Sequence, residues 1–368
     1  MSDEKRFHAR LFWLQSGARE VFETHRVRVC CRVTVPLRKV EIWGNVEDKR
    51  AKYRNVIRCG SVWHCPVCAN NITAHRRSEI EQVISVFREV TLPVMVSFTL
   101  RHKREDSLMF TLDTLTKSWR TMTSGKAWTK LSSDCLRGYV KSLEVTFGIS
   151  NGWHPHYHVL FFVNPEVCLT KMYAQIKDRW MQSVVVSGGS SNEHATRMTT
   201  TDASVAGYIA KWGHEPRQDV LARLSHWGHA AEMVRGGIKR GKRGHLTPFD
   251  MLELYVMGGD HQPMWAALCA EYGKTMVGQR QIAWSRSPNM RQEAGIKKEL
   301  EDSDVVEGTD AGYYLLATIE PDDWSAILWA GCQGVILDVA ARGDEGMMRG
   351  IIEDCKAEHL KSIAKSCK

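Results

Sequence analysis

Residues 138–163, GYVKSLEVTFGISNGWHPHYHVLFFV, decide the fold, because they hold two strand patterns separated by a turn signal. Residues 138–147 read as one strand and residues 153–163 as another. The Asn-Gly pair at 151–152 is the strongest short-range signal for a turn between them. The stretch therefore predicts an antiparallel hairpin.

Another strand and several helices are expected around this hairpin. Residues 94–100 alternate apolar and polar side chains, as a half-buried strand does. Strands followed by crossing helices predict an α+β core with an antiparallel sheet. Helices are expected at residues 74–90, 106–122, 166–183, 202–212 and 248–290, and a small, mostly helical element at 299–368.

Three histidines recur at every second position of the second hairpin strand. His154, His156 and His158 therefore point to one face, because successive side chains of a strand alternate between its faces. Converging neutral imidazoles predict a site for a divalent ion such as Mn²⁺, or for Mg²⁺ with added carboxylate. A lone histidine near an apolar run is more often an ordinary side chain, but the strict period of two favours a metal site.

Glu144, on the first hairpin strand, is the candidate oxygen ligand that a hard cation requires. A hairpin centred on Asn151 would place Glu144 opposite His158 and Thr146 opposite His156. This register puts the carboxylate on the histidine face. A slip of one residue would reverse the face and leave Glu144 as an ordinary solvent-facing acid.

Tyr208 and Lys211 are three residues apart in an expected helix, so their side chains are neighbours. A lysine beside a phenol favours the phenolate and can also hold a phosphate. In isolation this pair would more often mark a core tyrosine. Its weight comes from the metal site that precedes it in the sequence.

Five of the 11 cysteines lie between residues 30 and 68. Cys59, Cys65 and Cys68 form most of a structural zinc site, since Cys-x-x-Cys is the usual tight half of such sites and Zn²⁺ needs four ligands. Buried or redox-active thiols are the alternative. The candidates for the fourth ligand are Cys30 first, then its rival Cys31, then His64 and His75.

The net charge of +8 is unevenly distributed. Residues 1–298 hold 44 Lys and Arg against 27 Asp and Glu, whereas residues 299–368 hold 6 against 15. A basic body suits a polyanion such as DNA, although a solvated surface would have the same charge. The predicted phosphate contacts are Arg76, Arg77, Lys239, Arg240, Lys242 and Arg243, of which the last four fit a solvated loop nearly as well.

The order and spacing of these motifs resemble those of the HUH endonucleases, and more closely those of plasmid rolling-circle replication initiator (Rep) proteins. Residues 96–102 (VSFTLRH) match the first motif. Residues 143–146 (LEVT) with residues 152–160 (GWHPHYHVL) match the second, and residues 208–211 (YIAK) match the third. Residues 59–68 and 246–250 also look like stretches of this family on either side of the core.

The resemblance implies an HUH-type core, a central antiparallel sheet flanked by helices. An N-terminal zinc-binding segment that contacts DNA is expected at residues 1–90, and the nicking domain at 91–260. A helical C-terminal region at 261–368 would end in an acidic element. Family resemblance also favours a cysteine at position 30 or 31 as the fourth zinc ligand.

The resemblance further implies the chemistry. His156 and His158 become the firm metal ligands, with Glu144 and His154 contending for the third position. With Mn²⁺ or Mg²⁺ bound, Tyr208 would attack single-stranded or extruded origin DNA, keep a 5′-phosphotyrosine and release a 3′-hydroxyl primer. Strand rejoining would follow later. Some relatives run that step with a second tyrosine or a preceding glutamate, but here Ser204 stands at the latter position.

Three other functions fit part of the pattern. An HUH transposase or mobilisation relaxase would use the same chemistry on another substrate, although a relaxase often has its tyrosine near the N-terminus. A zinc-dependent DNA-binding regulator without catalysis would leave the histidines and Tyr208 without a role. A metal hydrolase that uses water would likewise not need Tyr208.

The sequence also indicates what the protein works with and where. It contains no Walker-type phosphate loop, so no nucleotide cofactor is expected, and host helicase and replication proteins would be separate partners. No apolar run reaches the roughly 18–20 residues of a membrane span. The polar N-terminus does not resemble a signal peptide, which predicts a cytoplasmic protein.

Overall fold

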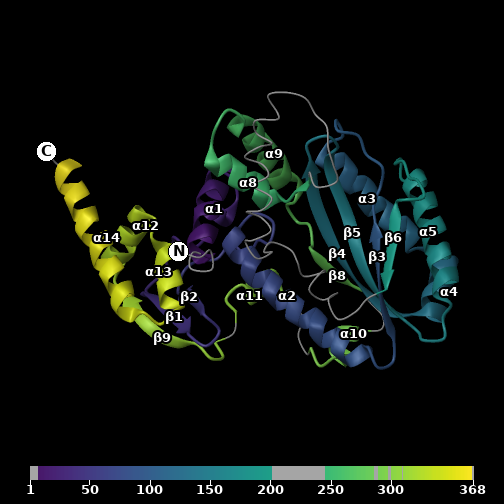
Figure 1. Cartoon of the computed structure of the whole chain (residues 1–368), viewed down its shortest axis with the longest axis horizontal. Helices are drawn as coiled ribbons and strands as arrows, with labels where there is room; N and C mark the ends of the chain where they lie inside the picture. Colours follow the sequence, from purple (N-terminus) through teal and green to yellow (C-terminus); the bar gives the residue numbers. More distant parts are fainter. Residues whose placement is uncertain (1–6, 201–244, 286–288, 297–299, 309, 367–368) are drawn as a thin grey trace.

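The computed structural model describes residues 7–200, 245–285, 289–296, 300–308 and 310–366. Within these ranges the chain has the predicted α+β architecture, with helices around antiparallel sheets and a mostly helical C-terminal part (Figure 1). A six-stranded sheet carries the histidines, and a three-stranded sheet joins the two ends of the chain. The expected helix at 202–212 lies outside the described residues.

The larger sheet is built on the predicted hairpin. Its strand order is β6-β3-β5-β4-β7, with β8 also paired to β4. All three predicted strands are present, and their ends lie within two residues of the expected positions. The strands are β3 (Leu92–Phe98), β4 (Leu136–Gly148), β5 (Gly152–Val163), β6 (Thr196–Thr200), β7 (His245–Leu246) and β8 (Ile282–Trp284).

The register of the hairpin differs from the prediction by two residues. Glu144 lies opposite His156, not His158, because Gly148 pairs with Gly152 and the turn is the three-residue stretch 149–151. Gly152 has a φ of 76°, the left-handed conformation that such three-residue hairpin loops use. Since a shift of two residues preserves the face, Glu144 still lies on the histidine face.

Three helices cover the face of the sheet that the histidines do not occupy (Figure 1). Aromatic rings fill this layer, with Phe98 of β3 in edge-to-face contact with Trp119 and Trp180. Both tryptophans are buried, so this layer anchors the back of the sheet. The helices are α3 (Leu108–Met122), α4 (Gly125–Cys135), which was not predicted, and α5 (Leu169–Val186).

Among the described residues, helices cover the histidine face over only part of its length. Beyond His158 the same face continues with Leu160 and Phe162, which pack under α2 (Pro66–Phe87) and α10 (Met290–Glu293). The face therefore changes from apolar to polar along β5, and the polar half holds the histidines. Helix α2 begins eight residues before the predicted start, because Cys65 caps it and Pro66 suits its first turn.

The first and last parts of the chain pack together, as Figure 1 shows at one end of the molecule. Strand β9 pairs with β1, and the carboxylate of Asp338 accepts hydrogen bonds from the backbone N–H groups of His8 and Ala9 at the start of α1. The elements are α1 (Phe7–Val21), the 3-10 turn η2 (Arg26–Arg28), β1 (Val40–Asn45), β2 (Arg50–Arg54), α11 (Asp302–Val305), β9 (Tyr314–Ile319), α12 (Pro321–Ala330), α13 (Gln333–Ala340) and α14 (Glu345–Ser366).

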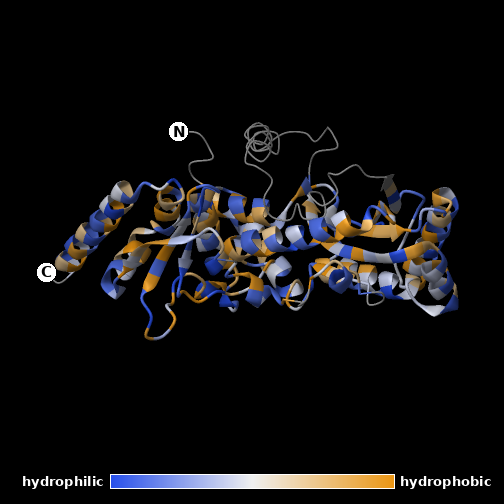
Figure 2. Cartoon of the chain, turned by 90° about the horizontal axis from the view of Figure 1, so that it is seen from below, coloured by the Kyte–Doolittle hydropathy of each residue, from blue (hydrophilic) through white to orange (hydrophobic). Residues whose placement is uncertain are grey.

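Two helices, α8 (Pro248–Met257) and α9 (Gln262–Thr275), connect this end to the larger sheet. The prediction that residues 248–290 are helical was wrong beyond Met276. Gly278 takes a φ of 74°, and residues 282–284 then pair with β4 as β8. Polar and apolar residues are interleaved along the helices (Figure 2), and within the described ranges none of them is long and apolar enough to cross a bilayer.

Candidate metal sites

Glu144, His156 and His158 converge on one point of the histidine face. The Oε2 atom of Glu144 lies 2.9 Å from Nε2 of His156 and 2.8 Å from Nε2 of His158. The two Nε2 atoms are 3.1 Å apart. Both imidazoles are buried, so three donor atoms meet in a small space that the adjacent strands hold in place.

The other ring nitrogen of each imidazole has a partner of its own. Nδ1 of His156 lies 3.1 Å from the backbone oxygen of His154, and Nδ1 of His158 lies 2.8 Å from Oγ of Ser97. A carbonyl oxygen only accepts, so the Nδ1 atom of His156 carries the hydrogen. In the neutral ring Nε2 then has a free lone pair, as a metal ligand requires.

The charges of the three side chains are coupled. Burial raises the pKa of Glu144, but the neighbouring His156 and His158 outweigh it and hold that pKa well below its usual range. Burial lowers the pKa of His156, yet the Glu144 carboxylate reverses this and the net shift is upward. Burial lowers the pKa of His158. The carboxylate is therefore ionised and attracts a cation to the site.

His154 shares the face but points to a different partner. Its Nδ1 atom lies 2.9 Å from Nε2 of His102, in the segment after β3, and its ring also faces His245. Burial and the neighbouring histidines lower its pKa to about 3. Of the two contenders for the third ligand position, Glu144 is the one that lies with His156 and His158.

The three grouped donors fit a divalent cation. Two imidazole nitrogens and one carboxylate oxygen suit Mn²⁺, and Mg²⁺ would accept the same group with water in addition. Three protein ligands also leave coordination positions open for a substrate oxygen. Tyr208, Lys211, Lys239, Arg240, Lys242 and Arg243 lie outside the described residues.

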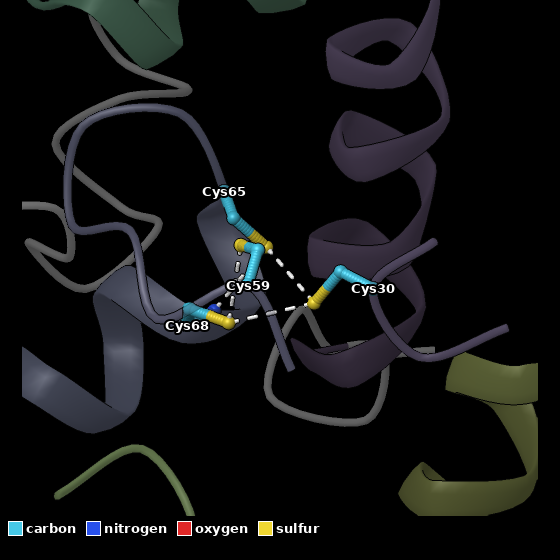
Figure 3. Close-up of side chains that lie close together, drawn as sticks. All are labelled: Cys30, Cys59, Cys65 and Cys68. Carbon is cyan, nitrogen blue, oxygen red and sulfur yellow. Dashed lines mark hydrogen bonds between the residues drawn. The ribbon is translucent and has the colours of Figure 1, made fainter. Parts of the chain in front are cut away.

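Four cysteines form a second group near the start of α2 (Figure 3). Sγ of Cys30 lies 3.7 Å from that of Cys65 and 3.5 Å from that of Cys68, and Sγ of Cys59 lies 3.6 Å from that of Cys68. Tetrahedral zinc with bonds of about 2.3 Å separates its sulfurs by about 3.8 Å. The four thiols therefore fit a structural Zn²⁺.

The sulfurs also have the surroundings that thiolate ligands need. Cys65 caps α2, and its Sγ accepts hydrogen bonds from Cys68 N and from Nε2 of Gln15 on α1. Arg19 donates to the carbonyl of Cys30, so α1 is tied to both halves of the cluster. These contacts connect the N-terminal helix to the loop at 59–68.

The rival candidates for the fourth zinc position have other partners. Cys31 lies beside Cys30 but receives a hydrogen bond from the guanidinium of Arg58 at 2.8 Å. His64 contacts Oγ of Ser61 and the carbonyl of Gly273 through its two ring nitrogens. His75 faces Glu79.

The two predicted phosphate contacts on α2 differ in their surroundings. Arg76 is largely buried and donates to Glu79, to Asp302 and to the carbonyl of Leu300. These bonds give Arg76 a structural role, and its contact with phosphate stays a prediction. Arg77 is exposed and pairs with Glu81, an exchangeable surface contact.

Comparison with known proteins shows which family the central part of the chain resembles. Residues 50–183 match the family model described as replication protein, a range that contains the loop at 59–68 and the Glu144, His156 and His158 group. This central part of the chain is similar to a replication protein domain. The resemblance to plasmid Rep proteins is thereby confirmed.

Two curated relatives extend this comparison. Protein rep of Streptomyces lividans is 26% identical, across 74% of this chain and 72% of that protein. The neomycin resistance protein of Streptomyces cyanogenus is 31% identical, across 29% of this chain and 31% of that protein. No solved structure gives a significant match to the chain.

Sequence reasoning missed two residues beside the histidines of β5. Ser97 and His102 both lie in the stretch 96–102, which matches the first motif without indicating a role for either residue. The alternation of residues 94–100 placed Ser97 on the opposite face from Val96 and Phe98, but that signal does not say which strand lies beside it. The β3–β5 pairing supplies the missing contact, since Ser97 lies directly opposite His158.

Proposed function

We propose that this Rep protein initiates rolling-circle replication by nicking single-stranded or extruded origin DNA in a metal-dependent reaction. The observation that carries the proposal is the convergence of Glu144, His156 and His158 within the replication protein domain. A DNA-binding regulator would have no use for two buried imidazoles and an ionised carboxylate that share one point.

Each residue would have a defined task. Glu144, His156 and His158 would hold Mn²⁺ or Mg²⁺, which supplies Lewis acidity at the scissile phosphate when bound. The phenolic oxygen of Tyr208 would lose its proton to water and form a bond to phosphorus while the bond from phosphorus to the 3′-oxygen breaks, and that oxygen would take a proton from water and leave as a hydroxyl. Lys211 would favour the phenolate by its charge.

The products explain the link to replication. The 3′-hydroxyl would prime a host polymerase, and a host helicase would open the duplex ahead of it. The phosphotyrosine would conserve the bond energy, so that the strand can be rejoined without ATP. The Cys30, Cys59, Cys65 and Cys68 group would hold Zn²⁺ and so fix α1 against α2 beside the nicking domain.

The decisive experiment measures a covalent adduct. The purified protein is incubated with labelled single-stranded origin DNA and Mn²⁺, and a shifted, denaturant-resistant protein–DNA band is expected. Tyr208→Phe should abolish the band, whereas Tyr314→Phe, a matched change at an exposed tyrosine of β9, should leave it unchanged. Absence of the band for the wild type overturns the proposal, and an adduct with Tyr208→Phe overturns the choice of nucleophile.

The alternative functions give other outcomes of the same assay. A transposase or relaxase would form the adduct on transposon-end or transfer-origin DNA and not on a replication origin. A non-catalytic regulator would bind DNA without any adduct. The Rep domain match favours replication over both.

A further inference from the structure

Four basic residues, Arg101-His102-Lys103-Arg104, follow β3 at the end of the histidine face; we call them the basic loop. Arg101, Lys103 and Arg104 are exposed, whereas His102 is half-buried. The loop lies beside the hairpin turn, because Arg104 backbone atoms face Gly152, where an added Cβ atom would lie 2.6 Å from the Arg104 carbonyl oxygen. The loop is therefore next to the strand that carries the metal ligands.

Contacts fix the backbone of the loop and leave its long side chains outside. Nε2 of His102 lies 2.9 Å from Nδ1 of His154, which ties the loop to β5 two residues from His156. Arg101 N donates to the carbonyl of Ser190 at 2.9 Å, and Lys103 N donates to the carboxylate of Asp106 at 2.7 Å. A preorganised backbone reduces the entropy that is lost when a ligand binds.

The three long cationic side chains of the loop differ from two other exposed arginines near the sheet. Arg77 and Arg137 pair with Glu81 and Glu293. In contrast, the described part of the chain contains no ion pair to Arg101, Lys103 or Arg104. Two acids, Glu105 and Asp106, lie in the same turn, but the Asp106 carboxylate is engaged by the backbone of Lys103. Three cations are thus left to face solvent beside the metal ligands.

We propose that the basic loop binds the phosphodiester backbone of single-stranded DNA next to the scissile phosphate. This inference rests on the proposed function, since it places the scissile phosphate at Glu144, His156 and His158. His154 and His156 are two strand residues apart, about 6.6 Å. That distance is short enough for the loop to meet a phosphate next to the scissile one.

The experiment measures how DNA affinity depends on salt. Binding of a fluorescent single-stranded oligonucleotide is followed by anisotropy over a series of NaCl concentrations, without added Mn²⁺ or Mg²⁺. The loop variant is Arg101→Gln/Lys103→Gln/Arg104→Gln. The matched control is Lys126→Gln/Lys130→Gln/Lys171→Gln, which removes three exposed cations from α4 and α5 on the opposite face of the sheet.

The loop variant should bind more weakly and reduce the slope of log K against log[salt] by about 2, because each phosphate contact on a single strand contributes about 0.7. The loss should be the same for two oligonucleotides of unrelated sequence, since backbone contacts carry no sequence information. The control variant should keep the wild-type slope. Melting curves of both variants check that the fold is retained.

The outcomes separate this inference from the proposed function. A wild type that binds single-stranded DNA and forms the adduct, with an unchanged slope for the loop variant, overturns the loop assignment alone. An equal loss in the control variant overturns it as well, because the effect would then be one of net charge. A wild type that binds no single-stranded DNA overturns the proposed function and this inference together.

Discussion

Oγ of Ser97 on β3 lies 2.8 Å from Nδ1 of His158 on β5, across a pair of residues that are in direct register. When Nδ1–H donates to this hydroxyl, Nε2 of His158 is left unprotonated and directed toward Glu144 and His156. Ser97 is in this sense a positioning residue, which acts on a metal through the histidine and does not touch the metal itself.

Removal of the Ser97 hydroxyl should weaken metal binding. Ser97→Ala is expected to lower the affinity for Mn²⁺ by about 10- to 100-fold, the usual effect of losing such an outer partner, while Ser97→Thr restores most of it. The measurement is titration calorimetry. Ser142→Ala is the matched control, because Ser142 flanks His158 from β4 and its Oγ has no hydrogen-bond partner among the described residues. Equal losses for both alanine variants would contradict the role of Ser97.

Metal binding should weaken as the pH falls, and His156 should set the pH at which it does so. Burial lowers the pKa of His156 but the Glu144 carboxylate outweighs it, so the pKa lies above the ordinary 6.5. Below this pKa a proton must leave before metal binds, so the affinity for Mn²⁺ should fall about tenfold per pH unit. Above it, calorimetric titrations should give a constant affinity.

The stability of the metal-free protein should change with pH in the opposite direction to the metal affinity. A raised histidine pKa contributes stability that is complete below the unfolded value of about 6.5 and is lost as pH rises through the folded pKa.

Glu144→Gln should move the pH at which metal affinity begins to fall to a lower value, because the charge that holds the proton on His156 is gone. If that pH stays unchanged, another group controls it.

The cysteine group should hold one equivalent of zinc. Cys30→Ser should remove it and release α1 from the loop at 59–68, since structural zinc contributes directly to folding free energy. Metal content by atomic emission and thermal melting would record both effects. The matched control is Cys31→Ser, which changes the adjacent buried thiol that contacts Arg58 and should leave the zinc bound. If Cys31→Ser loses the zinc and Cys30→Ser keeps it, the fourth ligand is Cys31.

Periodicity predicted the parts of the fold that local sequence controls. The strands at 94–100, 138–147 and 153–163 were expected because alternation is visible in a single segment, and the face shared by His156 and His158 follows from it. Local sequence did not predict the register of the hairpin. The Asn-Gly signal suggested a turn centred on Asn151, whereas the loop is 149–151 and Gly152 already belongs to β5.

Contacts between distant segments were beyond sequence reasoning. Strand β9 pairs with β1 although more than 260 residues separate them in the sequence, and no local pattern predicts such a pairing. Cys30 was the first choice for the fourth zinc ligand, ahead of its rival Cys31, and it lies with Cys59, Cys65 and Cys68. Its proximity to Cys65 depends on how α1 packs against α2, which spacing in the sequence does not show.

Gly152 offers the test of how the hairpin and the basic loop fit together. Its φ of 76° disfavours any side chain, and a Cβ atom there would lie 2.6 Å from the carbonyl oxygen of Arg104. Gly152→Ala should therefore destabilise the protein by about 2–5 kcal/mol, the sum of a left-handed residue and an overpacked contact. Urea unfolding at neutral pH measures this as a lower midpoint.

Gly188→Ala separates the two contributions to that loss. Gly188 has a similar φ of 85°, but no described atom lies within 4 Å of the added carbon. It should therefore cost only the backbone strain, about 1–2 kcal/mol. The excess for Gly152→Ala then measures the contact between the hairpin turn and Arg104, and because relief of that clash displaces the basic loop, the same variant should weaken single-stranded DNA binding. Equal unfolding midpoints for the two variants would mean that the backbone of the basic loop does not pack closely against the hairpin turn.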